Sequence, residues 1–380
     1  MQFEFNEQQR MIRDMARDFA AREIAPIAAE CDVQEKFPAE VVKKMGELGF
    51  MGMNVPEQYG GAGLDSLCYI LAMEEISKAC ASCGVIMSVN NSLVCWPLET
   101  YGNEEQKKQW LTPLAKGEKL GAYCLSEPGA GTDAAAQSTT VKKDGDGWII
   151  NGMKNFITNG AHADTLIVFA HSNPELNYKG IMALIVDKEA EGFSVIRKEE
   201  KMGIRASDTA QLAFDNVWVP DSQVLGPEGS GFKVAMSTLD GGRIGIAAQA
   251  LGISGAAYEA ALAYSKEREQ FGRPICKFQA IQWKIADMAT RLEAARLLTY
   301  RAAWVKDQGG RFSTESAMAK LFASEASHFI TNEAVQIFGG NGYSKEYPVE
   351  RHFRDAKITE IYEGTSEAQR LVISSMELKK

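Results

Sequence analysis

The segment "DAKITEIYEGTSEAQRL", residues 355–371, holds the acidic side chains of this 380-residue chain whose spacing most suggests chemistry. Glu360, Glu363 and Glu367 stand three and then four residues apart, and Gly364 directly follows the middle one. On an unbroken helix this spacing would align the three carboxylates on one solvated face. A helix broken at the glycine would instead present one carboxylate to a cleft, where it could act as a general base.

The residues after the glycine favour the broken helix. Ser366 and Gln369 have the spacing of a capping box, which would start a new helix. We therefore predict that Glu363 lies on the break and faces a cleft. Glu360 is then expected in solvent, and Glu367 is expected on the first turn of the new helix.

A glycine loop, "LSEPGAGTD" at residues 125–133, is a second candidate. Gly129 and Gly131 would let a ligand approach the backbone, and Ser126 and Thr132 supply hydroxyl groups. Such a loop can hold a phosphate or an electron-rich ring with its amides, although a tight turn would explain the same residues. It is not a G-x-G-x-x-G motif between a strand and a helix, so it predicts no Rossmann domain.

The stretch "NFITNG", residues 155–160, has the pattern of a strand that ends in a turn. Phe156 and Thr158 would point to the same side of that strand. An aromatic ring and a hydroxyl in this arrangement could flank a flat cofactor ring. The alternative is an ordinary core phenylalanine beside a cross-strand threonine.

Two adjacent glycines interrupt the helical stretch "LDGGRIGIAAQALG" at residues 239–252. In a helix interior, Gly241 and Gly242 each cost roughly 1 kcal/mol relative to alanine. They indicate either a kink or the close approach of another group. Asp240 and Arg243 flank the pair and could contact a polar ligand or form a local salt bridge.

Two further motifs place glycine near the ends of predicted helices. In "KEREQFGRP", residues 266–274, Arg268 could bind a phosphate with two hydrogen bonds, or it could be a surface arginine. The motif "QIFGGNGY", residues 336–343, is a glycine turn that a simple helix cap would also explain.

The first third of the chain has helical periodicity, with Asn6 and Gln9 as a capping pair. Residues 121–226 instead contain short runs rich in Val, Ile, Phe and Trp, separated by Gly, Asn and Asp turns. Because no long helical crossovers separate these runs, we predict antiparallel strands. From Phe232 the helical period returns, and helices are expected at residues 232–268, 278–308, 314–338 and after Ser366.

The chain is therefore predicted to have an α+β fold with three parts. Their expected limits are an N-terminal helical domain at residues 1–120, a middle antiparallel β domain at 121–230, and a C-terminal helical domain at 231–380.

Composition excludes several classes of function. The formal net charge of −9, from 41 Lys and Arg against 50 Asp and Glu, argues against a broad nucleic-acid surface. Seven scattered cysteines suit reduced thiols, and four histidines without ligand spacing disfavour a metal site. Cys80 and Cys83 form a C-x-x-C that could be a redox pair or two small residues on one helical turn. We see no secretory signal and no run of about 20 apolar residues, so we expect a soluble cytoplasmic protein, or a mature form already trimmed, without a membrane span.

Taken in order, six motifs resemble those of the acyl-CoA dehydrogenase family, and the short-chain or butyryl-CoA members are the most similar. The resemblance covers nearly the whole chain and rests on "SEPGAGTD", "NFITNG", "LDGGRIGIAAQALG", "REQFGRP", "QIFGGNGY" and "RDAKITEIYEGTSEAQR". It implies the same three domains, with a four-helix bundle as the last. It also implies a homotetramer, built as a dimer of dimers, with FAD bound across a subunit interface.

The resemblance also implies roles for individual residues. The flavin ring would contact Tyr123, Leu125, Ser126, Gly131, Thr132, Phe156 and Thr158. The diphosphate and adenosine end of FAD would contact Arg268, Gln270, Phe271 and Gln279, with Gln336, Gly339 and Gly340 from a neighbouring subunit, and Thr365 and Glu367 would complete the site. The acyl-CoA substrate would touch Thr132, Asp240, Arg243 and Gly364. Many members have tryptophan where this chain has Phe156, so an aromatic face is kept and the indole hydrogen bond is lost.

The reaction that the resemblance implies is α,β-dehydrogenation of an acyl-CoA thioester, a step of fatty-acid β-oxidation, with Glu363 as the base. Electrons would pass to an electron-transfer flavoprotein. Some relatives place the base on the long helix, at the position of Gly242, which cannot serve. A glutaryl-CoA enzyme would be expected to have arginine near Gly84, so an uncharged acyl chain of four to six carbons is favoured.

Other functions stay open at this stage. The enzyme could act on a short branched acyl-CoA of the 2-methylbutyryl type, or react as an acyl-CoA oxidase. The chain could also be a non-catalytic homologue that binds flavin or acyl-CoA, against which an intact Glu363 argues. A helical scaffold without ligand would leave the glycine loops unexplained.

Overall fold

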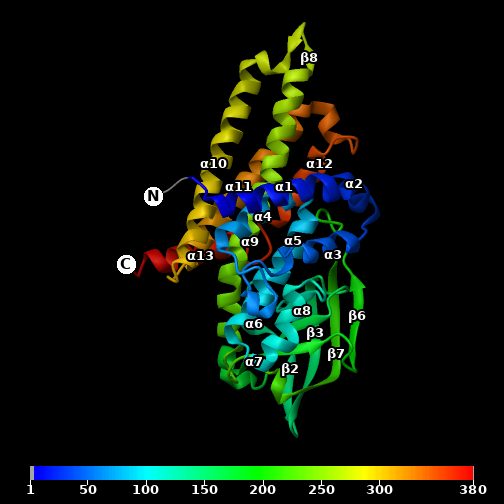
Figure 1. The fold of residues 1–380 in the computed structure, drawn as a ribbon, viewed down its shortest axis with the longest axis vertical. Helices are drawn as coiled ribbons and strands as arrows, with labels where there is room; N and C mark the ends of the chain where they lie inside the picture. The colour runs from blue at the N-terminus through cyan, green and yellow to red at the C-terminus, as the bar shows by residue number, and fades with distance from the viewer. Residues whose placement is uncertain (1–3, 380) are drawn as a thin grey trace.

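The computed structural model describes residues 4–379, so residues 1–3 and 380, at the outer ends of the first and last predicted domains, lie outside it. Helices, a β-sheet and long helices follow one another along the chain, as predicted (Figure 1). The helical part before the sheet consists of α1 (Glu7–Phe19), η1 (Ala20–Ile24), α2 (Ala25–Gln34), α3 (Ala39–Glu47), η2 (Phe50–Gly52), η3 (Glu57–Tyr59), α4 (Ser66–Ala79), α5 (Ala81–Ser88), η4 (Val89–Cys95), α6 (Trp96–Tyr101), α7 (Glu104–Gln106), η5 (Lys107–Leu111) and α8 (Thr112–Ala115). The capping pair predicted for α1 is confirmed, because the Gln9 amide donates to Asn6 Oδ1 at 2.8 Å and the Asn6 amide donates to Gln9 Oε1 at 3.1 Å.

The middle of the chain forms a sheet with the strand order β1-β4-β2-β3-β7-β6, and β5 pairs with β4. Its elements are β1 (Gly121–Cys124), η6 (Ala134–Ala136), β2 (Thr140–Asp144), β3 (Gly147–Thr158), β4 (Thr165–His171), η7 (Pro174–Gly180), β5 (Ile181–Asp187), β6 (Phe193–Lys198), β7 (Thr209–Pro220) and η8 (Asp221–Gln223). Most pairs are antiparallel, as expected, but β4 is parallel to β1 and, through the single pair Thr140 and His171, to β2. A parallel pair needs a long connection. Residues 125–164 provide it with the glycine loop and the β2–β3 hairpin, which the sequence argument for antiparallel pairing did not consider.

Long helices dominate the last part of the chain. They are α9 (Gly231–Glu267), α10 (Gln279–Asp307) and α11 (Ser313–Phe338), with β8 (Glu269–Gln270), β9 (Arg273–Pro274), η9 (Ile275–Lys277), η10 (Gly339–Tyr343), α12 (Val349–Ile358) and α13 (Ser366–Glu377) around them. Helix α9 runs from the sheet to the tip formed by β8 (Figure 1). The sequence analysis did not predict α12, which leads into the segment that carries Glu363.

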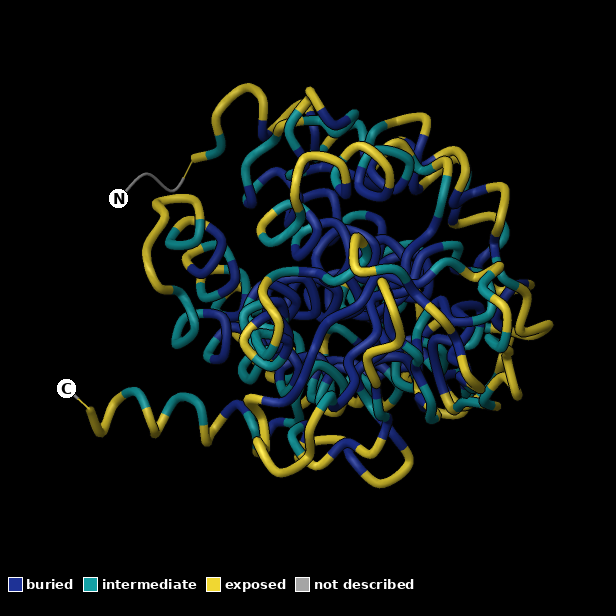
Figure 2. Tube along the Cα trace, turned by 90° about the horizontal axis from the view of Figure 1, so that it is seen from below, coloured by how far each residue is buried: buried dark blue, intermediate teal, exposed yellow. Residues whose placement is uncertain are grey.

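Two hydrophobic clusters hold these parts together. One joins the N-terminal helices to α9, α10 and α11. The other joins Leu93 of η4, Tyr123 of β1, Val234 of α9 and Ala356 of α12. All three parts of the chain therefore meet around the start of the Glu363 segment. Figure 2 shows the buried interior and, extending from it, the last helix α13.

Candidate active site

The acidic segment breaks where its sequence predicts. Helix α12 ends at Ile358 and α13 starts at Ser366. Between them Glu363 and Gly364 have positive φ angles of 52° and 95°. A left-handed backbone is uncommon for glutamate and costs about 1–3 kcal/mol, so the surrounding structure must impose it.

The residues that hold the break differ in detail from the prediction. Thr365, not Ser366, is the N-cap of α13, and its hydroxyl accepts from the Ala368 amide at 3.2 Å. The capping box predicted for Ser366 and Gln369 was therefore wrong. The reason is that the Gln369 side chain faces back to the break, where Nε2 donates to the Gly364 carbonyl at 2.8 Å and to the Glu363 carbonyl at 3.3 Å.

The three glutamates have separate environments. Glu363 is half-buried as a residue, but its Oε2 is buried and has no hydrogen-bond partner among the described residues. Glu367 is exposed on the first turn of α13. Glu360 was expected in solvent, but it is half-buried and forms an ion pair with Lys357 at 2.6 Å. Because Lys357 lies three residues earlier, at the end of α12, it neutralises Glu360 locally.

Gly242 makes room for the Glu363 carboxylate. A Cβ atom at this position would lie 2.1 Å from Glu363 Oε2 and 2.8 Å from Leu93 Cδ2. Of the two explanations offered for the glycine pair, close approach therefore applies at Gly242. Since α9 runs as one helix from Gly231 to Glu267, the pair does not end it. A side chain at Gly242 and the side chain of Glu363 would occupy the same place, so only one of them can supply a base.

Two cations offset the burial of the Glu363 carboxylate. Burial raises the pKa of Glu363 to about 7, while Lys320 and Arg243 lower it. The Glu363 carboxylate therefore changes its protonation state near neutral pH, the range in which a general base is most effective.

The pair predicted at Asp240 and Arg243 is present. Arg243 is buried on α9 and forms an ion pair with Asp240, which also accepts a hydrogen bond from the Ser313 hydroxyl at 2.6 Å. The Nε atom of Arg243 is buried without a hydrogen-bond partner among residues 4–379. Burial lowers the pKa of Arg243, and Asp240 and Glu363 oppose that effect. The site thus combines a salt bridge with one donor that is still available to a ligand.

The glycine loop has an open side and a buried anchor. Gly129 and Gly131 are exposed, and a Cβ atom at either position would have no other atom within 4 Å. On the buried side, Lys154 Nζ donates to the Leu125 carbonyl at 3.1 Å and to Glu127 Oε1 at 2.7 Å. The loop is therefore anchored on its buried side, and its exposed side is open to a ligand.

The residues that anchor this loop were missed by the sequence analysis. Glu127 also accepts from the Ser138 hydroxyl at 2.7 Å and the Thr139 amide at 3.0 Å, while Lys154 donates to Gln137 Oε1 at 3.0 Å. The burial of Lys154 could have been predicted from the alternation of side chains along β3. Lys154 is an even number of residues from the buried Trp148 and Ile150, so it points to the same face of the strand.

Phe156 lies beside this loop with a strained backbone. Its φ angle is 56°, at a register shift between β3 and β7, and its side chain is 65% exposed. The core-phenylalanine alternative is therefore wrong for Phe156, because the shift turns its ring out of the sheet. Thr158 is half-buried two residues on, Ser126 is half-buried, and Thr132 is exposed, whereas Tyr123 and Leu125 are buried beneath the loop.

A third group of predicted residues lies at the far end of α9. Arg268, Gln270, Phe271 and Gln279 are exposed at the tip around β8, as are Gln336, Gly339 and Gly340 near the end of α11. The two sets lie at the same end of the folded molecule, because Asn341 donates to the Tyr264 hydroxyl at 2.9 Å and Tyr264 stacks on Phe338. From Gly242 to Arg268 the helix covers roughly 40 Å. One subunit therefore does not bring these residues to its own Glu363.

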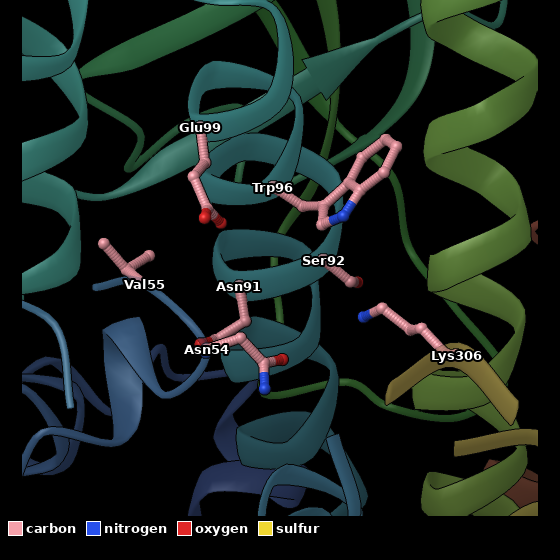
Figure 3. A pocket seen from close by; sticks show the side chains of 7 residues that line it. All are labelled: Asn54, Val55, Asn91, Ser92, Trp96, Glu99 and Lys306. Carbon is pink, nitrogen blue, oxygen red and sulfur yellow. The ribbon is translucent and has the colours of Figure 1, made fainter. Parts of the chain in front are cut away.

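An open groove lies beside the Glu363 segment, and a small cavity lies between η4, α6 and the end of α10. An open groove of about 200 Å³ is lined by Thr365 and Glu367 together with Glu325, Lys357, Glu360, Ile361, Ser366 and Arg370. A cavity of about 10 Å³, with room for about one water molecule, lies between Asn54, Asn91, Ser92, Glu99 and Lys306 (Figure 3). It contains none of the predicted site residues.

Lys320 was also missed by the sequence analysis. This residue of α11 is fully buried, and its Nζ donates to the Gly364 carbonyl at 2.7 Å. Its position was readable from the sequence, because Ala317, Ala323 and Ser324, three and four residues away on the same helical face, are small and buried.

Other predicted features can be placed as well. All seven cysteines are free thiols, and Cys80 and Cys83 are both buried. No group of three or more His, Cys, Asp or Glu side chains within residues 4–379 is arranged to hold a metal ion. Within the same residues, no helix is long and apolar enough to cross a membrane.

Comparison with known proteins agrees with this arrangement. Models for the N-terminal, middle and C-terminal domains of acyl-CoA dehydrogenase match residues 6–118, 122–217 and 229–377. The short-chain specific acyl-CoA dehydrogenase of Bos taurus mitochondria is 56% identical over 376 residues, which cover 99% of this chain and 91% of the relative.

Two solved structures are similar over their full length and the full length of this chain. Butyryl-CoA dehydrogenase from Megasphaera elsdenii has 48% identity, a TM-score of 0.98 and 100% coverage of both chains. A chain in a structure described as the electron transferring flavoprotein of Acidaminococcus fermentans has 52% identity, a TM-score of 0.99 and 100% coverage of both. With family models over most of its length and relatives of this identity, the chain belongs to the acyl-CoA dehydrogenase family.

Proposed function

We propose that this chain is a short-chain acyl-CoA dehydrogenase, which converts an acyl-CoA of four to six carbons, butyryl-CoA above all, to the trans-2-enoyl-CoA. The observation that carries the proposal is the Glu363 carboxylate, whose buried Oε2 has no hydrogen-bond partner among residues 4–379, on a strained break and against a helix that leaves out a side chain at Gly242. A buried carboxylate normally has partners, so one without them is a candidate for chemistry. The short-chain relatives support the choice of substrate.

The residues present fit FAD as the cofactor. The exposed ring of Phe156 and the open side of the loop at Gly129 and Gly131 provide a flat apolar ring beside exposed glycine backbone. The groove at Thr365 and Glu367 could take a further part of the cofactor. FAD, when bound, supplies the acceptor for the hydride that leaves the β-carbon of the substrate.

Glu363 is assigned the role of taking the α-proton. A glutamate of ordinary pKa, near 4.3, is a poor base for such a proton. Burial raises the pKa of Glu363 to about 7, and expulsion of water by substrate would act in the same direction. The Glu363 amide, held at a fixed angle by the break, is the candidate donor to the thioester carbonyl, and one such donor can contribute roughly 10²–10³ in rate.

The acyl-CoA is proposed to bind to four residues: Arg243, Asp240, Thr132 and Gly364. The unpartnered Arg243 Nε is available to a polar group of the substrate, and the salt bridge to Asp240 fixes the guanidinium.

The tip residues are proposed to serve the flavin of another subunit. Two sets of residues lie at the same end of the folded molecule, so we infer that one partner subunit supplies both. The first set is Arg268, Gln270, Phe271 and Gln279, and the second is Gln336, Gly339 and Gly340. Phe271 is 93% exposed and has a φ angle of 51°, which suits a residue that is covered on assembly. This requirement for a partner supports at least a dimer, and the homotetramer, a dimer of dimers, is proposed from the resemblance to the family.

The proposed electron acceptor is an electron-transfer flavoprotein, by analogy with the Acidaminococcus fermentans structure. We propose a cytoplasmic location, since seven free thiols suit a reducing compartment. We keep the domain limits 1–120, 121–230 and 231–380, because β1 begins at Gly121 and α9 at Gly231.

Anaerobic titration with acyl-CoA thioesters tests the proposal. The flavin absorbance should bleach with butyryl-CoA and hexanoyl-CoA, and less with octanoyl-, isovaleryl-, 2-methylbutyryl- or glutaryl-CoA. Strongest bleaching with 2-methylbutyryl-CoA would favour the branched-chain alternative. A yellow protein that stays oxidised with every thioester would favour the non-catalytic homologue, and rapid reoxidation by oxygen would indicate an oxidase.

The Glu363→Gln variant tests the base itself. It should bind butyryl-CoA, seen as a shift of the flavin spectrum, while bleaching slows by about 10²–10⁴-fold, the range expected for loss of a general base. Bleaching at the wild-type rate would contradict the assignment of Glu363.

A further inference from the structure

The ammonium group of Lys320 has an unusual position for a lysine. The residue is fully buried on α11, and among the described residues its Nζ has no carboxylate within ion-pair distance. Its Nζ donates instead to the carbonyl of Gly364, at 2.7 Å. Burial without a paired charge is costly, so a lysine at this place must give something that a small apolar residue would not.

The bond from Lys320 ends on the strained part of the site. Gly364 is the second residue of the left-handed break, and its carbonyl accepts from both Lys320 and Gln369. A Cβ atom at Gly364 would lie 2.6 Å from Gln369 Nε2, so the two donors close tightly around this peptide. Two donors on one carbonyl fix the orientation of the peptide next to Glu363, although neither donor touches the carboxylate.

The groups that face Glu363 show that Lys320 also matters electrostatically. They are Lys320 from α11, Arg243 from α9, Tyr69 from α4, Tyr123 from β1 and Tyr362 from the segment itself. Burial raises the pKa of each of the three tyrosines, so their phenols are neutral at physiological pH. Lys320 and Arg243 are therefore the two charges that can favour the carboxylate.

These two cations are not equivalent. Arg243 is already committed to Asp240, whose negative charge cancels much of its field. Lys320 has no such partner among the described residues. Glu360 and Glu367 also raise the pKa of Lys320, but by less than Glu363 does. Burial lowers the pKa of Lys320 to about 8, and Glu363 opposes that shift. Between about pH 7 and pH 8, both groups are therefore mainly ionised.

We propose that Lys320 is a positioning residue for the general base: its ammonium group holds the Gly364 carbonyl, and with it the break that presents Glu363, while its positive charge favours the ionised carboxylate. The inference rests on the proposed function of Glu363. It adds a residue from a different helix that acts through the base and does not touch the substrate.

The test measures the protonation of Glu363 directly, without turnover. Purified holoenzyme is titrated with acid while its infrared spectrum is recorded, and the carboxyl band that is absent from Glu363→Gln is assigned to Glu363. The Lys320→Met variant keeps the length of the side chain and removes its charge, so the pKa of Glu363 should rise by at least one unit. At pH values below that pKa, the ionised fraction of Glu363 would then be about tenfold smaller than in the wild type. Lys320→Arg, which keeps the charge, should return the pKa toward that of the wild type.

Activity gives an independent comparison. In Lys320→Met the rate of flavin bleaching by butyryl-CoA should fall about tenfold at pH values below the pKa and recover as the pH is raised. A purely structural role would lower the rate equally at every pH. Lys44→Met is the matched control, because Lys44 is an exposed lysine of α3 paired with Glu23, and its loss should leave both readouts unchanged.

The outcomes separate this inference from the proposed function. An unchanged pKa of Glu363 in a folded, FAD-containing Lys320→Met protein would overturn the role of Lys320, whatever the substrate. A raised pKa would support it even if butyryl-CoA does not bleach the wild type, which would instead count against the proposed function. If Lys320→Met does not fold, Lys320→Gln replaces it, because glutamine can still donate a hydrogen bond and carries no charge, and the same rise in pKa is expected.

Discussion

Two buried lysines of this protein each lie near a buried glutamate, and the two neighbourhoods differ in how completely their polar atoms are paired. Lys154 and Glu127 form a direct ion pair at 2.7 Å, and hydrogen bonds from Ser138 and Thr139 reach the remaining carboxylate positions. Lys320 and Glu363 form no ion pair among the described residues, and Glu363 Oε2 has no hydrogen-bond partner there.

The electrostatic consequences are opposite. Burial alone would raise the pKa of Glu127, but Lys154 and the surrounding donors lower it to about 2. Burial raises the pKa of Glu363 to about 7 against two cations that do not touch it. A glutamate whose partners are complete stays ionised and supports the loop, while a glutamate kept near its cations but not paired can accept a proton at neutral pH.

The strongest test of this comparison removes the cation of the paired site. Lys154→Met leaves Glu127 charged and buried without its ion-pair partner, so we expect a loss of about 3–5 kcal/mol in the free energy of unfolding. The glycine loop should loosen with it, and FAD should dissociate more readily. Chemical denaturation and the flavin content after gel filtration measure the two effects.

Two further variants control that experiment. The double variant Lys154→Met with Glu127→Gln should recover part of the lost stability, because no buried charge is then left unpaired. Lys143→Met removes an exposed lysine of the same β unit, paired with Asp221, and should change little. A Lys154→Met protein of wild-type stability and flavin content would contradict the view that this pair anchors the loop.

The next test changes the space around the unpaired carboxylate. Gly242→Ala puts a methyl group where Glu363 Oε2 lies, and a displacement of about 1 Å at a reacting group can cost roughly 10²-fold in rate. The helical preference of alanine over glycine, roughly 1 kcal/mol, is opposed here by the overlap of the new methyl group with Leu93 Cδ2, which lies 2.8 Å from its position. We therefore expect kcat to fall about 100-fold in a protein that still folds and binds FAD, with a melting temperature below that of the wild type.

Gly255→Ala is the matched control for that variant. Gly255 lies on the same helix, and a Cβ atom there would meet only Arg296 Nη2, at 3.9 Å, an ordinary contact. It should gain the same helical preference without loss of rate. Equal rates in both glycine variants would show that the clearance at Gly242 has no catalytic importance.

The same contrast explains how far the sequence could go. Glu363, Gly364 and Gly242 were identifiable because local rules single them out: a glycine after a glutamate predicts a break, and glycines inside a helix predict a close approach. The three blocks of helix, sheet and helix followed from periodicity, and α12 was missed because its ten residues lie between glycine-rich turns.

What could not be predicted depends on contacts between distant segments. Lys320 meets Gly364 across 44 residues, and Lys154 meets Glu127 across 27. Both lysines could be placed on buried faces from their periodicity, but the partner of each is fixed only by the tertiary fold.

The last prediction concerns pH and stability, where the two glutamates should act with opposite sign. The folded-state pKa of Glu363 lies near 7, above the unfolded value, so its contribution to stability is complete below the unfolded pKa and is lost as the pH rises toward 7. Glu363→Gln should therefore gain stability relative to the wild type between pH 5 and pH 8.

Glu127 provides the opposite case within the same measurement. Its folded-state pKa is near 2, so it stabilises the protein above the unfolded pKa and loses that effect only as the pH falls through the folded value. Glu127→Gln should therefore be destabilised by a nearly constant amount over the same pH range. Thermal unfolding of both variants and the wild type at pH 5, 6, 7 and 8, with equal excess FAD, gives the comparison. A Glu363→Gln difference that does not change with pH would mean that Glu363 is not held near neutrality by its burial, and the contrast between the two sites would then rest on geometry alone.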